Sequence, residues 1–190
     1  MRYLLDTSSI VTPFHDGKLN SLRVGMNHAS LSETEGFLWN WFSNAFGTQC
    51  LVGCDELFVE VSKKDDAAKR LVNQLREERC IMTLSPEPKT FAYLEDITRF
   101  VQAHFEAHQA DEFLKGNDPM LIALAKTHEV GIVTEERLPI PEYDSKAGKI
   151  KGKVPLPYVA WAFGVPCVPL SYVLLVLPEQ IAEVEEASAG

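Results

Sequence analysis

The sequence has few cysteines and little positive charge. Its 190 residues include four cysteines, and no CxxC pair is present that would indicate a zinc site. Free thiols buried in a reducing compartment are the simplest interpretation of Cys50, Cys54, Cys80 and Cys167. Only 18 Lys and Arg residues stand against 27 Asp and Glu residues, which gives a net charge of −9. This charge excludes bulk electrostatic attraction to nucleic acid, so any nucleic-acid role needs a local site or a bound cation.

Long apolar segments are also missing. The longest run, residues 165–177, is interrupted by Pro166 and Pro169 and is shorter than the roughly 18–20 residues that a membrane-spanning helix needs. The N-terminal segment reaches Asp6 after three apolar residues, too early for the core of a signal peptide. We therefore expect a cytoplasmic protein with no membrane partner.

The composition is that of an average globular protein. Hydrophobic residues make up 46% of the chain and charged residues 24%. The length suits one domain, and no internal repeat or linker divides the sequence. We expect a single domain over residues 1–190.

Short apolar segments alternate with helical patterns. Strands are predicted at 3–5, 50–52, 81–84, 130–134 and 165–168, and helices at 32–47, 56–61, 65–79, 91–108, 118–125, 156–163 and from 178 onward. Ser32 and Glu35 have the spacing of a capping box, and the hydroxyls of residues 7–9 could cap a following turn. Residues 138–153 are predicted to be an exposed loop. This alternation predicts an α/β fold with a parallel sheet.

Acidic residues stand where the predicted strands end. Asp6 follows the first strand, Glu135 and Glu136 follow the strand at 130–134, and Asp118 opens a helix. In parallel α/β sheets, functional groups gather at the carboxyl ends of the strands. The helix after the second strand adds Glu60 or Glu56, which lie one turn apart, and the pattern alone does not choose between them.

Several carboxylates at one sheet edge repel each other unless protons or a cation neutralise them. Oxygen ligands without paired His or Cys suit a hard ion, Mg²⁺ or Mn²⁺, which also recruits phosphate oxygens. The acidic residues therefore indicate phosphodiester or phosphoryl chemistry. His104 and His108 are four residues apart but lack the HExxH pattern of a zinc site.

Four blocks of the sequence resemble the ordered blocks of PIN-like nuclease domains, most closely a VapC-like branch of bacterial proteins. These blocks are residues 3–9 (YLLDTSS), 59–61 (VEV), 117–125 (NDPMLIALA) and 132–136 (IVTEE). Residues 153–157 and 163–167 are similar to the last blocks of that branch. The resemblance thus extends over most of the chain.

This resemblance implies a three-layer α/β/α fold and a Mg²⁺- or Mn²⁺-dependent endoribonuclease, the toxin of a type II toxin–antitoxin pair. Asp6, Glu60 and Asp118 would form the acidic triad, and Glu136 matches the acid of the family's Thr-x-Asp end. Because this position is Glu rather than Asp, with Glu135 beside it, ligation could be direct or through water. A hydroxyl of Thr7 or Ser8 would orient Asp6 or a metal-bound water.

The implied partners are an RNA substrate and a cognate antitoxin, and the sequence leaves a homodimer open. RNA binding would depend on the ion and on the basic segment that contains Lys146, Lys149, Lys151 and Lys153. One alternative is a catalytically silent PIN-like module that binds a protein or RNA. Another is a Mg²⁺-dependent phosphohydrolase of small molecules, although the Asp-x-Asp nucleophile pattern is missing because Thr7 and Ser8 follow Asp6.

Overall fold

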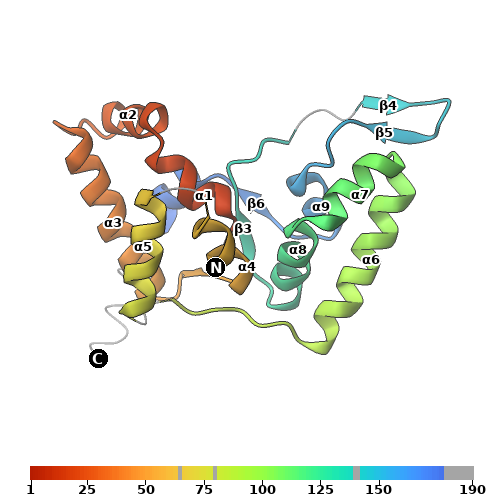
Figure 1. The fold of residues 1–190 in the computed structure, drawn as a ribbon, viewed down its shortest axis with the longest axis horizontal. Helices are drawn as coiled ribbons and strands as arrows, with labels where there is room; N and C mark the ends of the chain where they lie inside the picture. Colours follow the sequence, from red (N-terminus) through yellow and green to blue (C-terminus); the bar gives the residue numbers. More distant parts are fainter. Residues whose placement is uncertain (64–65, 79–80, 139–141, 178–190) are drawn as a thin grey trace. The chain divides into compact units, whose positions relative to one another are not determined.

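The computed structural model describes residues 1–63, 66–78, 81–138 and 142–177 (Figure 1). Its main sheet has the strand order β2-β1-β3-β6, formed by β2 (Leu51–Val52), β1 (Tyr3–Leu5), β3 (Gly131–Val133) and β6 (Cys167–Val168). β1 and β2 are parallel, with Tyr3 opposite Leu51. Helices flank this parallel sheet, so the predicted α/β class is confirmed, in agreement with a three-layer α/β/α arrangement.

The chain divides into two compact units. Among the described residues, the first contains those in 1–83, 133–135 and 168–177, and the second contains those in 84–132 and 136–167. The prediction of a single domain over residues 1–190 stays a prediction.

The first unit contains most of the buried aromatic residues. Its helices are α1 (Thr7–Val11), α2 (Asp16–Gly25), α3 (Leu31–Gly47), α4 (Asp55–Val61) and α5 (Asp66–Glu77), with a 3-10 turn at Thr12–Phe14 and a further helix at 170–177. The helical spacing predicts an apolar stripe of Phe37, Leu38, Trp41, Phe42, Ala45 and Phe46, and α3 buries all of these except Phe37, which is exposed. This apolar stripe is core packing, and Phe42 and Phe46 are completely buried.

The N-cap of α3 is Ser30, two residues earlier than the predicted capping box. The Ser30 side chain accepts a hydrogen bond from the Glu33 N–H (3.1 Å), and the Glu33 carboxylate accepts one from the Ala29 N–H (2.7 Å). The Ser32 and Glu35 pair has the same spacing but lies inside the helix. The sequence contains the pattern twice, and the first occurrence begins the helix.

The second unit is built on four helices and a hairpin. The helices are α6 (Pro88–His104), α7 (Ala107–Lys115), α8 (Asp118–Thr127) and α9 (Leu156–Ala162). α8 packs against α6, α7 and α9, which explains why its sequence is apolar nearly all round (Figure 1). The hairpin pairs β4 (Glu142–Asp144) with β5 (Lys149–Lys151). The predicted exposed loop at 138–153 is therefore wrong over these strands, and residues 139–141 lie outside the described residues.

Two further predicted elements differ from the structure. The helix predicted over 91–108 is interrupted at Phe105, whose extended backbone forms a bridge with Ile150, and α7 begins two residues later. The strand predicted at 81–84 is a single bridge between Thr83 and Gly53. The segment at 81–84 has little to pair with, because the segment that contains Gly53 enters α4 at Asp55, two residues after the bridge.

The predicted C-terminal helix from residue 178 lies outside the described residues. Across the described ranges, no helix has both the length and the apolar content needed to cross a membrane.

Candidate functional site

Asp6 lies at the carboxyl end of β1, where the chain turns into α1. Its N–H donates to the carbonyl oxygen of Val133 (2.9 Å), which extends the pairing of β1 by one residue. Its Oδ2 accepts hydrogen bonds from Ser8 Oγ (2.5 Å) and Thr134 Oγ1 (2.8 Å). Two hydroxyls from different segments therefore fix the orientation of this carboxylate.

Glu60 is held by the residue that follows Asp6. Thr7 Oγ1 donates a hydrogen bond to Glu60 Oε2, and Thr7 is buried. α1 packs against α4, so the carboxylates of Asp6 and Glu60 are both tied to the first residues of α1. A hydroxyl of Thr7 or Ser8 was expected to orient Asp6, and it is Ser8 that donates to Asp6, whereas Thr7 donates to Glu60. Neither hydroxyl caps the following turn, because α1 has no side-chain cap.

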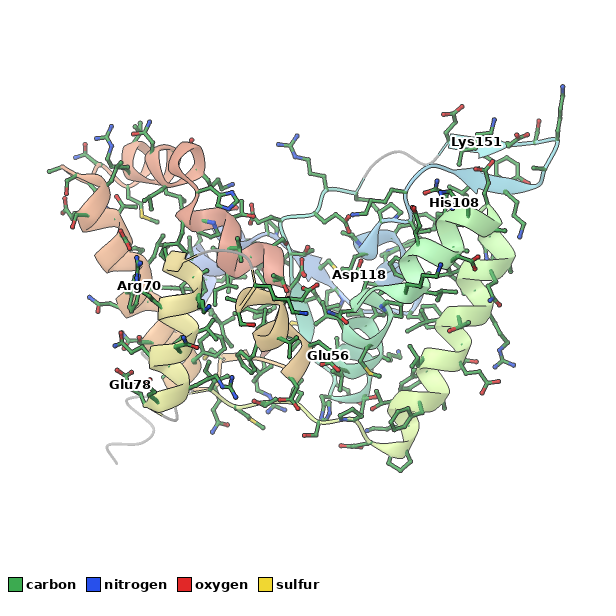
Figure 2. All side chains as sticks on the ribbon, viewed as in Figure 1. Glu56, Arg70, Glu78, His108, Asp118 and Lys151 are labelled. Atoms are coloured by element: carbon green, nitrogen blue, oxygen red, sulfur yellow. The ribbon has the colours of Figure 1, made fainter. Side chains whose placement is uncertain are left out.

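The alternative acid, Glu56, has a different neighbour. It lies in the first turn of α4 beside the thiol of Cys54 (Figure 2). Burial, together with the charge of Glu56 and its hydrogen bond to the thiol, raises the pKa of Cys54 to about 12. Of the two acids, it is Glu60 that contacts the segment after β1.

Glu135, predicted to support the site, has a bridging role in the first unit. Its N–H donates to Ser8 Oγ (3.1 Å), so the Ser8 hydroxyl links it to Asp6. Its carboxylate binds Lys18 Nζ (3.1 Å) and accepts from the N–H of Leu170 (3.0 Å), the first residue of the helix at 170–177. Glu135 thus ties α2 and that helix to the end of β3.

Sequence reasoning gave no role to Thr134, although it donates directly to Asp6. Its position in the sequence could have indicated this role, because Thr134 is the last residue of the predicted strand at 130–134 and directly precedes Glu135. A hydroxyl at the end of one parallel strand can reach an acid at the end of the adjacent strand.

Asp118 and Glu136 belong to the second unit. Asp118 is the first residue of α8 and is half-buried, with Asn117 as the N-cap and Pro119 in the first turn (Figure 2). Glu136 pairs with Lys153, and its Oε2 accepts from the N–H of Leu156 (2.7 Å), the first residue of α9. The Glu136 carboxylate therefore stabilises the N-terminus of a helix, a role that its sequence position did not predict.

The predicted RNA-binding lysines make local contacts. Lys149 Nζ donates to the carbonyl oxygens of Gln102 (2.7 Å) and Ala103 (2.6 Å), at the end of α6. Lys151 pairs with Asp144 (3.0 Å), which lowers the pKa of that carboxyl and raises the pKa of the lysine. These contacts, and the Lys153 pair with Glu136, attach the hairpin and the segment after it to their surroundings. The backbone N–H of Lys146 donates to Asp144 Oδ1 (2.9 Å) in the turn of the hairpin.

A pocket of about 200 Å³ opens beside Asp118 in the second unit. Its lining comes from α7, the start of α8 and the segment before α9, and consists of Gln109, Glu112, Phe113, Gly116, Asp118, Lys153 and Val154. The predicted acid Asp118 and the predicted RNA-binding residue Lys153 thus share one cavity.

The side chains of Asp6 and Glu60 suit a hard cation by their chemistry. Both are carboxylates, and neighbouring hydroxyls hold them in fixed orientations. Within either unit, the described residues include no group of three or more Asp, Glu, His or Cys side chains that could hold a metal ion. The metal site of Asp6, Glu60, Asp118 and Glu136 stays a prediction from the sequence.

Comparison with known proteins identifies a family without assigning an activity. No curated protein matches the sequence. A family model described as a domain of unknown function, DUF4411, matches residues 31–176. The match covers Glu60, Asp118 and Glu136 and begins after Asp6. Because it spans well over half of the 190 residues, the chain belongs to the DUF4411 family.

Proposed function

We propose that this protein is a Mg²⁺- or Mn²⁺-dependent endoribonuclease. The observation that carries the proposal is a pair of hydrogen-bonded carboxylates, Asp6 after β1 and Glu60 on α4. Asp6 accepts from Ser8 and Thr134, and Glu60 accepts from Thr7. Acids that merely solubilise a surface do not need three hydroxyl donors. Held carboxylates at the end of a parallel strand are typical of sites that bind an ion and a phosphate. The resemblance to PIN-like nucleases supports RNA as the substrate.

In this proposal, Asp6 and Glu60 are ligands of the divalent ion, and the three hydroxyls are positioning groups. When bound, the ion would orient a phosphate, lower the pKa of a water molecule and stabilise charge in the transition state. Ser8 and Thr134 both donate to the same oxygen of Asp6, which holds that carboxylate in one orientation. Asp118 and Glu136 stay predicted ligands, and each is tested by its own substitution.

Cleavage of a labelled single-stranded RNA by the full chain tests this function. Wild-type protein should cut the RNA with Mn²⁺ and not with EDTA. Asp6→Asn and Glu60→Gln should each reduce the rate by about 100-fold or more, because an electrostatic contribution of several kcal/mol is lost. Glu56→Gln is the matched control, since it removes the same charge one turn away in α4. Its rate should stay within about twofold of wild type.

The alternative is a catalytically silent module that binds RNA or protein. It predicts RNA binding in a gel-shift assay with no Mn²⁺-dependent product. Unchanged cleavage by Asp6→Asn would contradict the proposed site, and cleavage lost in Glu56→Gln but kept in Glu60→Gln would move the ligand one turn.

We further propose a type II toxin role, with a cognate antitoxin as partner, in the cytoplasm and as a homodimer. The toxin role and the antitoxin come from the resemblance, and the cytoplasmic location comes from a sequence with no long apolar segment. Expression of the chain should arrest growth of a bacterial host, and Asp6→Asn should relieve the arrest. Growth arrest that persists with this variant would contradict a nuclease toxin.

A further inference from the structure

Two hydrogen bonds in series connect Glu135 to the carboxylate of Asp6. The Glu135 N–H donates to Ser8 Oγ (3.1 Å), and Ser8 Oγ donates to Asp6 Oδ2 (2.5 Å). A serine hydroxyl has one hydrogen and two lone pairs, so an N–H that occupies a lone pair limits the directions left for the hydrogen. Thr134 Oγ1 lies farther from Ser8 Oγ (3.4 Å), so the carboxylate is the nearer acceptor. The position of the Glu135 N–H therefore influences where the Ser8 hydroxyl points.

The backbone leaves the sheet at Glu135. The Thr134 N–H donates to the carbonyl oxygen of Val168 in β6 (3.0 Å), whereas the next N–H, that of Glu135, donates to the Ser8 side chain. The N–H that directs Ser8 thus lies just beyond the strand, where the side chain of its own residue can fix its position.

The Glu135 carboxylate supplies that anchor. Its Oε1 accepts from the Leu170 N–H (3.0 Å), at the start of the helix at 170–177, and its Oε2 lies 3.1 Å from Lys18 Nζ of α2. Although the Lys18 side chain is 42% exposed, that of Glu135 is only 15% exposed, so the carboxylate is largely shielded from water. Two elements of the first unit therefore hold the residue whose N–H reaches Ser8.

These contacts favour an indirect role for both charged side chains. Each oxygen of the Glu135 carboxylate has a protein partner, so a bound ion would have to compete with Lys18 or with the Leu170 N–H. The Lys18 ammonium group faces a carboxylate, and a phosphate would have to displace it from that pair. An anchor that acts through the backbone of Glu135 requires neither exchange.

We infer that Glu135 is a positioning residue of the proposed metal site. Its carboxylate, held by Lys18 and by the helix at 170–177, fixes the N–H that directs the Ser8 hydroxyl to Asp6. The inference rests on the proposed function, in which Asp6 is a ligand of the divalent ion. It gives Lys18, for which the sequence indicated no role, an indirect part in the same site.

The affinity of the full chain for Mn²⁺, measured by isothermal titration calorimetry without RNA, tests the inference. Glu135→Ala and Ser8→Ala should each weaken Mn²⁺ binding about tenfold, because groups that orient a metal ligand typically have effects of this size. The double variant should bind no more weakly than Ser8→Ala alone, because Glu135 acts through the Ser8 hydroxyl. Two independent effects would instead multiply to about 100-fold.

Lys18→Met tests the anchor by the sign of its effect. Removal of a cation from a chain of net charge −9 should by itself tighten the binding of Mn²⁺. We expect Lys18→Met to weaken it by about two- to fivefold, since a partly exposed ion pair contributes up to about that ratio. Lys18→Arg keeps the charge of the pair and should bind Mn²⁺ like wild type.

Arg70→Met is the matched control. Arg70 is also a cation of the first unit, and its guanidinium pairs with Glu35 of α3 rather than with a residue of the candidate site (Figure 2). This variant should bind Mn²⁺ at least as tightly as wild type. Circular dichroism checks that all variants are folded. Multiplying effects of Glu135→Ala and Ser8→Ala would overturn the inference, as would tighter Mn²⁺ binding by Lys18→Met.

The outcomes also separate this inference from the proposed function. If Ser8→Ala removes the effect of Glu135→Ala on Mn²⁺ binding but the protein cuts no RNA, the positioning role is supported and the ribonuclease is contradicted. Mn²⁺-dependent cleavage by a protein in which the two effects multiply would do the reverse. Absence of Mn²⁺ binding by wild type would overturn both.

Discussion

Single hydroxyl groups organise the candidate site. One oxygen of the Asp6 carboxylate accepts hydrogen bonds from two hydroxyls, those of Ser8 and Thr134. Thr134, to which the sequence assigned no role, is buried. The Thr134 hydroxyl would affect cleavage through the Asp6 carboxylate, so it is a positioning group. A substitution that keeps the shape of the threonine side chain but removes its oxygen should therefore reveal its effect.

Thr134→Val should lower Mn²⁺-dependent RNA cleavage by about 10- to 100-fold, because a lost hydrogen bond to a charged group corresponds to about 1.5–3 kcal/mol. Thr134→Ser restores the hydroxyl and should recover most of the rate. Initial rates at several Mn²⁺ concentrations are the measurement. If the Val and Ser variants are equally impaired, packing rather than the hydroxyl matters at this position.

Cys54 gives a pH dependence that does not involve the proposed activity. Burial raises the pKa of its thiol from 9.0 to about 12. Above pH 9 the unfolded chain therefore loses this proton while the folded protein keeps it, so stability is full below pH 9 and falls as the pH rises towards 12. The slope from this one group approaches about 1.4 kcal/mol per pH unit.

Urea unfolding between pH 8.5 and 10.5 should show this decline in wild type and a shallower one in Cys54→Ala. Burial also raises the pKa of Tyr3, so its contribution is present in both proteins and cancels in the difference. Parallel curves for the two proteins would assign the alkaline loss of stability to other groups.

The acids show how much of the site a sequence can predict. Asp6 and Glu60 were identified from their places after a strand and on a helix face, because those places follow from local patterns. The carboxylates of Glu135 and Glu136 contact residues that lie 17 to 117 positions away along the chain. Side-chain bonds over such separations leave no periodic signal, so their ties to helix starts could not be predicted.

At the scale of elements, helices with repeated apolar positions were predicted well, and α3 and α8 are examples. The short strand at 3–5 was also predicted, from three consecutive apolar residues. The interruption at Phe105 depends on pairing with Ile150, which lies in a different element. The position of a break that tertiary pairing imposes is not written in the local pattern of residues 91–108.

α6 offers a test at this scale, because a buried threonine pair anchors its first turn. The Glu87 N–H donates to Thr90 Oγ1 (2.9 Å), and that hydroxyl also bonds Thr127 Oγ1 of α8 (2.9 Å). Thr90→Val removes both bonds and leaves the Thr127 hydroxyl buried. We expect a loss of about 1–3 kcal/mol in the free energy of unfolding, measured in urea.

Thr98→Val is the matched control for this substitution. Thr98 is on the same helix, but its hydroxyl bonds only the carbonyl of Leu94 (2.8 Å), within its own helix. Its replacement should change the free energy of unfolding by less than about 1 kcal/mol. Equal losses at the two positions would mean that the link between α6 and α8 contributes little.

At the scale of the whole molecule, the charge of −9 makes any divalent cation a general screen as well as a specific ligand. The two effects differ in their dependence on one side chain. A specific ion stabilises the folded state by mass action, by about 2.7 kcal/mol at one hundred times its Kd. For a chain of this size that corresponds to a rise of roughly 5–10 °C in Tm.

Mn²⁺ should therefore raise the Tm of wild type by this amount in differential scanning calorimetry at constant ionic strength. Asp6→Asn should abolish the rise, because one ligand charge is lost, whereas Glu56→Gln should keep it, because that acid contacts Cys54 and no part of the site. NaCl at matched ionic strength removes the general screening from the comparison. A rise of equal size in all three proteins would show that Mn²⁺ acts on the net charge alone. The carboxylates of Asp6 and Glu60 would then have no special affinity for the ion.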